Sequence, residues 1–427
     1  MELPLISVSE DHTEPLRSSL PSWREWWQER CPRSLAVLAL TAFLVNCQPS
    51  EPYLTRFFKE EKGLSDPDLN RKVWPTNTYA TFAFYLPAGM MAEQLGYKST
   101  ILLGLLFREG TRMVLVFGEG LRAAILSQLA YAVATNVNAV LFGYVFAVVE
   151  PEHAAFGSAL VQGCYHAGNA VGSGLGQLLV SYGGWDDAHL VNLFYLSWAF
   201  TSLGLLVFLV GWPSARSSFR FETLAVEIRD HGVRSLGAKF SKELGSALAR
   251  PWCLYFIAAV CSHFIFGNYF QTLVSDRRPK APFGLLELGV EVAGLAGTGL
   301  VAWRLVDSAV HDSPWASAVS ALCLYGAGLV VSTIPLIALL YGATIALPFL
   351  YGVGRTAAYA CIGSATSSRY ATVFTLLNFA GMAASVIVTE IVSALPNSTT
   401  VSYYHAAAGV CGAMLLMLVI TRIVFPR

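Results

Sequence analysis

The chain has 427 residues, of which 55% are hydrophobic and only 13% are charged. Charged residues make up about a quarter of a typical soluble domain, so this composition excludes an ordinary soluble protein and predicts a membrane protein. The formal net charge is zero, and the sequence has no basic patch interleaved with aromatic residues. Nucleic acid is therefore not expected as a partner.

The first 32 residues are polar and end in several arginines. A cleaved signal would begin with basic residues and reach an apolar core sooner, so we expect residues 1–32 to be a retained N-terminal tail. About twelve apolar runs follow, each of a length that can cross about 30 Å of hydrocarbon. The predicted spans are residues 33–48, 75–94, 99–118, 123–149, 156–181, 189–212, 252–275, 283–305, 315–333, 336–363, 370–395 and 401–424.

A stretch rich in arginine and lysine, residues 213–250, separates the first six predicted spans from the next six. Because basic loops stay on the cytosolic side, this loop and both termini are predicted to lie in the cytosol. The resulting division is a tail (1–32), a first six-helix half (33–212), a central loop (213–250) and a second six-helix half (251–427). This pattern predicts an all-α membrane protein with the architecture of the major facilitator transporters, in which the substrate binds between the halves.

Few charges lie within the predicted spans, where each costs a few kcal/mol and normally faces the interior of the bundle. Glu51 lies at a break where two closely spaced prolines end the first span, and Glu291 lies deep in the eighth span. One carboxylate in each half predicts two facing walls of a central cavity. Arg355 and Glu390, on the tenth and eleventh spans, are predicted to form a structural charge network, because a paired buried charge costs less than a lone one.

The other candidate residues for chemistry favour a structural interpretation. For His166, His263 and His405 we expect core or interface imidazoles. Of the eight cysteines, seven lie in apolar runs and none forms a CxxC pair. We expect these seven to be small buried residues, so neither a metal site nor a cofactor is predicted. The sequence has no HExxH or GxSxG motif, so an enzyme is not expected, and no segment indicates the filter of a channel.

Several short motifs occur in a characteristic order along the chain. They are PSEPYLTRFF (49–58), YVFAVVEPEH (144–153), VGSGLGQLLVS (171–181), RPWCLYF (250–256), NYFQ (268–271), GVE (289–291) and RYATVF (369–374). In order and spacing they resemble the family of reduced folate carriers and thiamine transporters, over nearly all twelve spans. The resemblance implies a solute carrier that moves a vitamin across the plasma membrane by alternating access.

Within this family, the charge of the substrate separates two patterns. Glu51 and Glu291 match the carboxylates of the pattern for thiamine, which is a cation, and Asn268 matches its asparagine in the seventh span. Asn138 and Ser385 stand where the folate carriers have an arginine and a lysine. The resemblance therefore implies thiamine or a thiamine-like organic cation as substrate. A reduced folate or another anionic vitamin is the alternative, and a nutrient receptor that does not transport is a second alternative.

The thiamine pattern is incomplete in this chain. Asn77 and Asn169 replace aromatic residues that would provide stacking surfaces, and Asn138 replaces a glutamate. Arg112 replaces a tryptophan and would repel a cation unless an acidic residue neutralises it, so Arg112→Trp is predicted to improve thiamine uptake. The predicted substrate-binding residues are Glu51, Asn77, Arg112, Asn138, Asn169, Asn268, Gln271 and Glu291.

Two further expectations concern coupling and modification. A carboxylate in the cavity can exchange a proton when the substrate leaves, so a coupled proton or an exchanged anion is expected alongside the vitamin. The sequence Asn397-Ser398-Thr399 falls in the predicted external loop between the last two spans, which makes Asn397 a glycosylation candidate.

Overall fold

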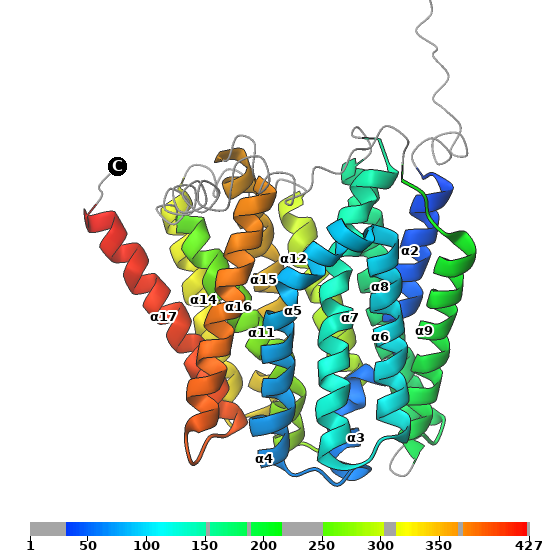
Figure 1. Ribbon diagram of the computed structural model, residues 1–427. Helices are drawn as coiled ribbons and strands as arrows, with labels where there is room; N and C mark the ends of the chain where they lie inside the picture. The colour runs from blue at the N-terminus through cyan, green and yellow to red at the C-terminus, as the bar shows by residue number, and fades with distance from the viewer. Residues whose placement is uncertain are drawn as a thin grey trace, which may run out of the picture.

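The computed structural model describes residues 31–150, 154–185, 189–215, 251–302, 313–365 and 370–424. Nearly all of the predicted tail and of the predicted central loop lies outside the described residues. The described part is a bundle of long helices that stand side by side, with the end of the last helix, α17, at the upper side of the bundle in Figure 1.

The long helices follow the predicted spans to within a few residues. In the first half they are α2 (Arg33–Asn46), α5 (Trp74–Leu95), α6 (Tyr97–Phe117), α7 (Gly120–Val148), α8 (Ala154–Tyr182) and α9 (Val191–Gly211). In the second half they are α11 (Pro251–Arg277), α12 (Phe283–Ala302), α14 (Pro314–Thr333), α15 (Ile337–Ala365), α16 (Tyr370–Ala394) and α17 (Thr400–Val424).

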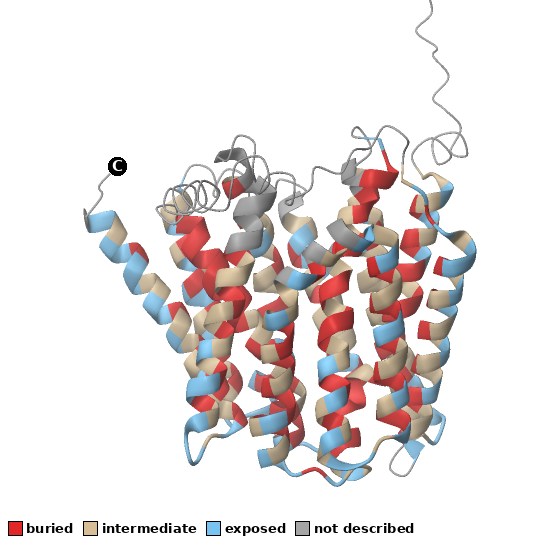
Figure 2. Cartoon of the chain, in the orientation of Figure 1, coloured by how far each residue is buried: buried red, intermediate tan, exposed pale blue. Residues whose placement is uncertain are grey.

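The composition of these helices suits a lipid environment. Within the described residues, 8 helices are long and apolar enough to cross a membrane. Large apolar side chains such as Phe117, Val210 and Ile423 are more than half exposed on the outside of the bundle, where lipid would cover them. Figure 2 shows buried residues concentrated on the faces that helices turn toward one another. The protein is an all-α, multi-pass integral membrane protein.

The first span is interrupted, as its two prolines predict. Helix α2 ends at Asn46, a single turn of 3-10 helix, η1 (Glu51–Tyr53), follows, and the short helix α3 (Leu54–Glu60) completes the crossing. We call residues 47–53 the first-span break. Backbone groups freed by such a break need partners inside the protein, and the Ser50 N–H donates to the Ser197 hydroxyl of α9 (2.9 Å).

Glycines on α8 allow the first-span break to pack closely against that helix. Gly172 and Gly176 lie one helical turn apart, and a Cβ atom added to either would clash with the backbone of Gln48 or Pro49. Gly174 lies between them on the opposite face, where an added Cβ would meet nothing within 4 Å. Small residues at such spacing let two backbones approach each other, which explains the glycines in the VGSGLG motif.

The two halves meet through α8 against α12 and through α5 against α16. At the end of the bundle that carries α4 (Asp66–Asp68), Asn70 of the first half forms hydrogen bonds with three residues of the second half. Its carbonyl oxygen accepts hydrogen bonds from the hydroxyls of Tyr403 (2.7 Å) and Tyr269 (3.4 Å). Its side-chain amide donates to Thr400 (3.2 Å).

Charged groups add to these hydrogen bonds between the halves. We call the whole set of contacts at this end the α4-end contact, and its residues are Lys59, Asp66, Asn70, Arg71, Tyr269, Asp276, Leu395, Thr400 and Tyr403. Lys59 of α3 lies 2.9 Å from the Asp276 carboxylate of α11 and 2.6 Å from that of Asp66. The Arg71 guanidinium donates to the carbonyl of Leu395, beyond the end of α16 (3.3 Å). The α4-end contact lies opposite the side on which the chain ends in Figure 1.

Candidate functional site

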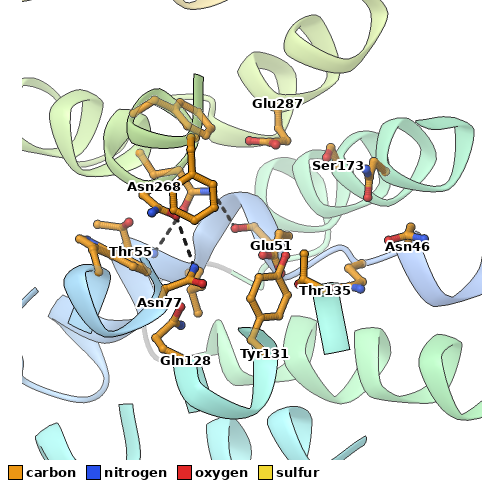
Figure 3. Close-up of a pocket in the computed structure, with 18 of the residues that line it drawn as sticks. Asn46, Glu51, Thr55, Asn77, Gln128, Tyr131, Thr135, Ser173, Asn268 and Glu287 are labelled. Atoms are coloured by element: carbon orange, nitrogen blue, oxygen red, sulfur yellow. Dashed lines mark hydrogen bonds between the residues drawn. The ribbon is translucent and has the colours of Figure 1, made fainter. Parts of the chain in front are cut away.

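A cavity of about 350 Å³ lies between the two halves. The first-span break, α5, α6, α7 and α8 line it from the first half, and α11 and α12 line it from the second half. Most of the side chains that line it are polar or aromatic. A volume of this size is that of a small-molecule site. Figure 3 shows side chains from both halves converging on the space around Glu51.

Six of the eight predicted substrate-binding residues line this cavity: Glu51, Asn77, Asn169, Asn268, Gln271 and Glu291. The other two do not. Asn138 lies beside Leu141 at small side pockets of about 10 Å³. Arg112 lies behind the first-span break, where only 1% of its side chain is exposed.

Two asparagines connect the halves across the cavity. Asn77 of α5 and Asn268 of α11 make an amide hydrogen bond (3.4 Å), and Asn268 also donates to Thr78 (3.2 Å). The hydroxyl of Thr81 donates to the Asn77 carbonyl oxygen (3.0 Å). Each amide both donates and accepts, so this pair can exchange its mutual bond for bonds to a ligand.

Gln271 binds the first-span break from the second half. Its side-chain amide donates to the Glu51 carbonyl oxygen (2.9 Å), and its own carbonyl oxygen accepts a hydrogen bond from the Thr55 N–H (3.4 Å). Dashed lines at Glu51 and at Thr55 in Figure 3 mark these two bonds. One side chain of α11 thus occupies two of the backbone groups that the break leaves free.

The Glu51 carboxylate is paired with Arg112. The distance between Glu51 Oε2 and Arg112 Nη2 is 3.2 Å, and Arg112 also donates to Ser50 (3.2 Å) and to Gln48. Arg112 therefore holds the first-span break in place. The acid that neutralises it is Glu51, whereas the Glu109 carboxylate accepts hydrogen bonds from two side chains of α9.

The Glu291 carboxylate has two partners in the first half. One oxygen lies 2.6 Å from His166 Nδ1, and the other accepts a hydrogen bond from the Asn169 amide (3.0 Å). His166 is thus an interface imidazole, and its partner is a residue of the cavity wall. The contact joins α8 to α12 across the cavity.

The predicted site did not include two further charged residues of the helices, Arg108 and Glu287. Both line the cavity. Arg108 donates to the Val45 carbonyl (3.0 Å) and to the Asn46 side chain (3.1 Å). Helical spacing was the available signal for Glu287, because residues four apart share one helix face, which places Glu287 with Glu291.

The predicted charge network on α15 and α16 stays a prediction. Arg355 is exposed, and its guanidinium lies over the Tyr351 ring, 5.6 Å from the ring centre. The Glu390 carboxylate, also exposed, accepts a hydrogen bond from the Tyr79 hydroxyl (2.5 Å). Glu390 therefore connects α16 to α5 of the other half.

Comparison with solved structures identifies the fold. A nucleoside transporter, NupG, superposes with a TM-score of 0.66 at 12% sequence identity, covering 91% of this chain and 99% of its own. A peptide transporter, POT, in complex with alafosfalin superposes with a TM-score of 0.65 at 15% identity, covering 93% of this chain and 95% of its own. The described residues have the fold of the major facilitator transporters, with six long helices in each half around a central cavity.

Sequence comparison gives the family. The model of the reduced folate carrier family matches residues 32–236. Thiamine transporter 1 of Mus musculus is 24% identical over 410 residues, covering 84% of this chain and 82% of its own. The reduced folate transporter of Homo sapiens is 23% identical over 286 residues, covering 61% of this chain and 47% of its own. The chain is similar to the reduced folate carriers and thiamine transporters, a family whose named members are transporters and not enzymes.

Proposed function

We propose that this protein carries thiamine, or a thiamine-like organic cation, across a membrane by alternating access. The observation that carries the proposal is the set of three carboxylates around one cavity, Glu51 in the first half and Glu287 and Glu291 in the second. A carboxylate that lies within about 4–6 Å of a cation is stabilised in its charged form. The relatives named as thiamine transporters support the same class of substrate.

The uncharged side chains of the cavity fit the rest of such a ligand. The amides of Asn77, Asn169 and Asn268 can donate and accept hydrogen bonds at the edge of a flat pyrimidine ring. Aromatic side chains of the lining, among them Trp74 and Tyr131, offer faces on which a ring can stack. We assign these amides and the three carboxylates as the substrate-binding residues.

The α4-end contact supports a cycle in which the cavity is closed at that end. We propose that both termini and the central loop lie in the cytosol, and that the α4 end faces outward at the plasma membrane. Asn397, exposed between α16 and α17, would then be open to glycosylation. In this orientation an interior-negative potential favours entry of a cation by about 2.3 kcal/mol per charge per 100 mV.

A second candidate substrate is an anionic vitamin such as a reduced folate. The observation that favours it is Arg108, whose side chain lines the cavity. However, the Arg108 guanidinium already donates two hydrogen bonds to α2 residues. A cation remains the better fit to the charges of the cavity wall.

Uptake of labelled thiamine and labelled folate, measured side by side in a host that lacks both activities, tests the proposal. We expect saturable thiamine uptake that excess unlabelled thiamine suppresses and folate does not. Saturable folate uptake instead would establish the anionic alternative. Thiamine binding without accumulation, measured on the purified protein in sealed vesicles, would indicate a receptor. A pH gradient imposed on the same vesicles tests for a coupled proton.

A further inference from the structure

Glu287 and Glu291 occupy the same face of α12. They are four residues apart, so one helical turn separates them, and both line the central cavity. Figure 3 shows the Glu287 side chain extending from its helix into the space that Glu51 and Asn268 also border. Like charges at this spacing destabilise each other. The repulsion is larger away from bulk water, where the effective dielectric constant is lower.

The three carboxylates of the cavity differ in what neutralises them. Glu51 has the Arg112 guanidinium at 3.2 Å. Glu291 has the His166 imidazole at 2.6 Å and the Asn169 amide at 3.0 Å. Glu287 differs from both, because its Oε2 is buried and has no hydrogen-bond partner among the described residues.

A buried carboxylate oxygen without a partner is unfavourable in the empty site. Such an oxygen loses its hydration and gains no hydrogen bond in return. A cationic group that enters the cavity would supply the missing partner and would also reduce the repulsion between Glu287 and Glu291. Binding would therefore be favoured for a ligand whose positive charge reaches α12.

We propose that Glu287 is the main counter-charge for the substrate, and that it distinguishes a cation from a neutral molecule of the same shape. This proposal rests on the proposed function. The substrate's positive charge is then recognised by α12 and not by the first-span break, because Arg112 already compensates Glu51 in the break. Glu291 then serves as a second carboxylate whose position His166 and Asn169 fix.

The test compares two labelled ligands, thiamine and an uncharged isostere in which carbon replaces the positively charged ring nitrogen. Wild-type protein and Glu287→Gln are reconstituted in vesicles, and uptake is measured against concentration. For Glu287→Gln we expect the apparent KM for thiamine to rise roughly 10- to 100-fold, the range for loss of a charged hydrogen bond. The KM for the isostere should change less than threefold, roughly within the error of a surface substitution.

Glu119→Gln is the matched control, because it is the same substitution at an exposed residue in the turn between α6 and α7. Glu287→Met, a neutral side chain of similar length, is the second test variant. Thermal unfolding of both Glu287 variants in detergent should occur at the wild-type temperature or above it, because a buried carboxylate oxygen without a hydrogen-bond partner has been removed. A structural role of Glu287 would instead lower the unfolding temperature.

The outcomes separate the two proposals. If the wild-type protein takes up no thiamine, the proposed function is wrong. If it takes up thiamine and Glu287→Gln leaves the ratio of the two KM values unchanged, only the role of Glu287 is wrong. That role is also overturned if both ligands lose uptake by the same factor, or if both variants of Glu287 fail to fold.

Discussion

Arg112 of α6 and Glu51 of the first-span break form an ion pair, with 3.2 Å between Nη2 and Oε2. The arginine side chain is 1% exposed and the glutamate side chain 30%, so the guanidinium faces protein while the carboxylate reaches the cavity. The first-half carboxylate is therefore compensated within the chain before any ligand binds. Arg112 stabilises the conformation of the first-span break through its contacts with Ser50, Gln48 and Glu51. It would therefore influence a bound substrate only through the break.

Removing one member of this pair should be more harmful than removing both. Arg112→Gln leaves Glu51 without its partner, and we expect unfolding to become easier by about 3 kcal/mol, the low end for a broken buried pair because Glu51 is partly exposed. The double variant Glu51→Gln with Arg112→Gln should recover part of that loss. Thermal or denaturant unfolding of the four proteins measures the coupling, and strictly additive effects would contradict it.

Arg112→Trp is now expected to reduce thiamine uptake. The sequence alone predicted a gain, because a tryptophan matches the family pattern. The buried guanidinium contacts Ser50, Gln48 and Glu51, and an indole cannot replace these hydrogen bonds. Uptake per transporter at the cell surface is the quantity to compare, and a rise above the wild-type value would restore the earlier expectation.

Glu291→Gln should reduce uptake of a cationic vitamin, because the second carboxylate of α12 is lost, without loss of the protein from the membrane. The amide keeps the size of the side chain and a hydrogen bond to Asn169, but it removes the charge that faces His166. Uptake is measured together with surface labelling. Full uptake at normal surface level would show that the Glu291 charge takes no part in transport.

Two glycines of α8 provide a matched pair for the packing of the first-span break. In Gly172→Ala the new methyl group meets the backbone of residues 47 and 48, and we expect a loss of about 1–3 kcal/mol, as for other overpacked interiors. Gly174→Ala meets open space and should be neutral, or stabilising by up to about 1 kcal/mol through helix propensity. Unfolding temperatures in detergent compare the two, and equal effects would argue against close packing at this position.

The α4-end contact should influence which side of the membrane the cavity faces. Tyr403→Phe keeps the ring stacked on Tyr269 (4.0 Å between ring centres) but removes the hydroxyl that donates to Asn70. One hydrogen bond contributes about 1 kcal/mol, so the population open at the α4 end should rise about fivefold. Thr135 of α7 lines the cavity. An impermeant thiol reagent applied from the α4 end should then label Thr135→Cys faster.

Labelling of Thr135→Cys at the same rate with and without the tyrosine hydroxyl would show that the hydroxyl does not control opening. The chain without the introduced cysteine gives the background from native thiols. Lys59 and Asp276 offer a second site for the same measurement. Their ion pair is partly exposed, so its loss should have a smaller effect, within about 1 kcal/mol.

The sequence predicted the helices well, and its substrate-binding residues stay a prediction. Hydrophobic length is a strong signal for a membrane span, and a proline pair is a strong signal for a break, so both features lie where they were expected. Asn138 stays a predicted binding residue that does not line the cavity, because correspondence with a family position does not report the rotation of a helix. Asn138 lies against Leu141 and Arg108 in a side pocket.

Partners across helices were the other property that the sequence left open. Glu51 pairs with Arg112, 61 residues away, and Glu291 pairs with His166, 125 residues away. Such distances in sequence carry no periodic signal, so the compensation of each carboxylate had to come from the structure. For the same reason the sequence alone did not single out Glu287. Its role is inferred from the structure, in which Oε2 has no hydrogen-bond partner among the described residues.

The hydrogen bond between the Thr55 N–H and the Gln271 side chain makes hydrogen exchange at this one backbone amide depend on the transport cycle. The Thr55 N–H donates to a side chain of the opposite half, so separation of the halves at this level would expose that amide to water. Deuterium exchange at Thr55 would then occur only through the open state, at a rate set by its population. A substrate that favours the closed arrangement would slow this exchange, so one backbone hydrogen would report the conformational equilibrium of the whole carrier.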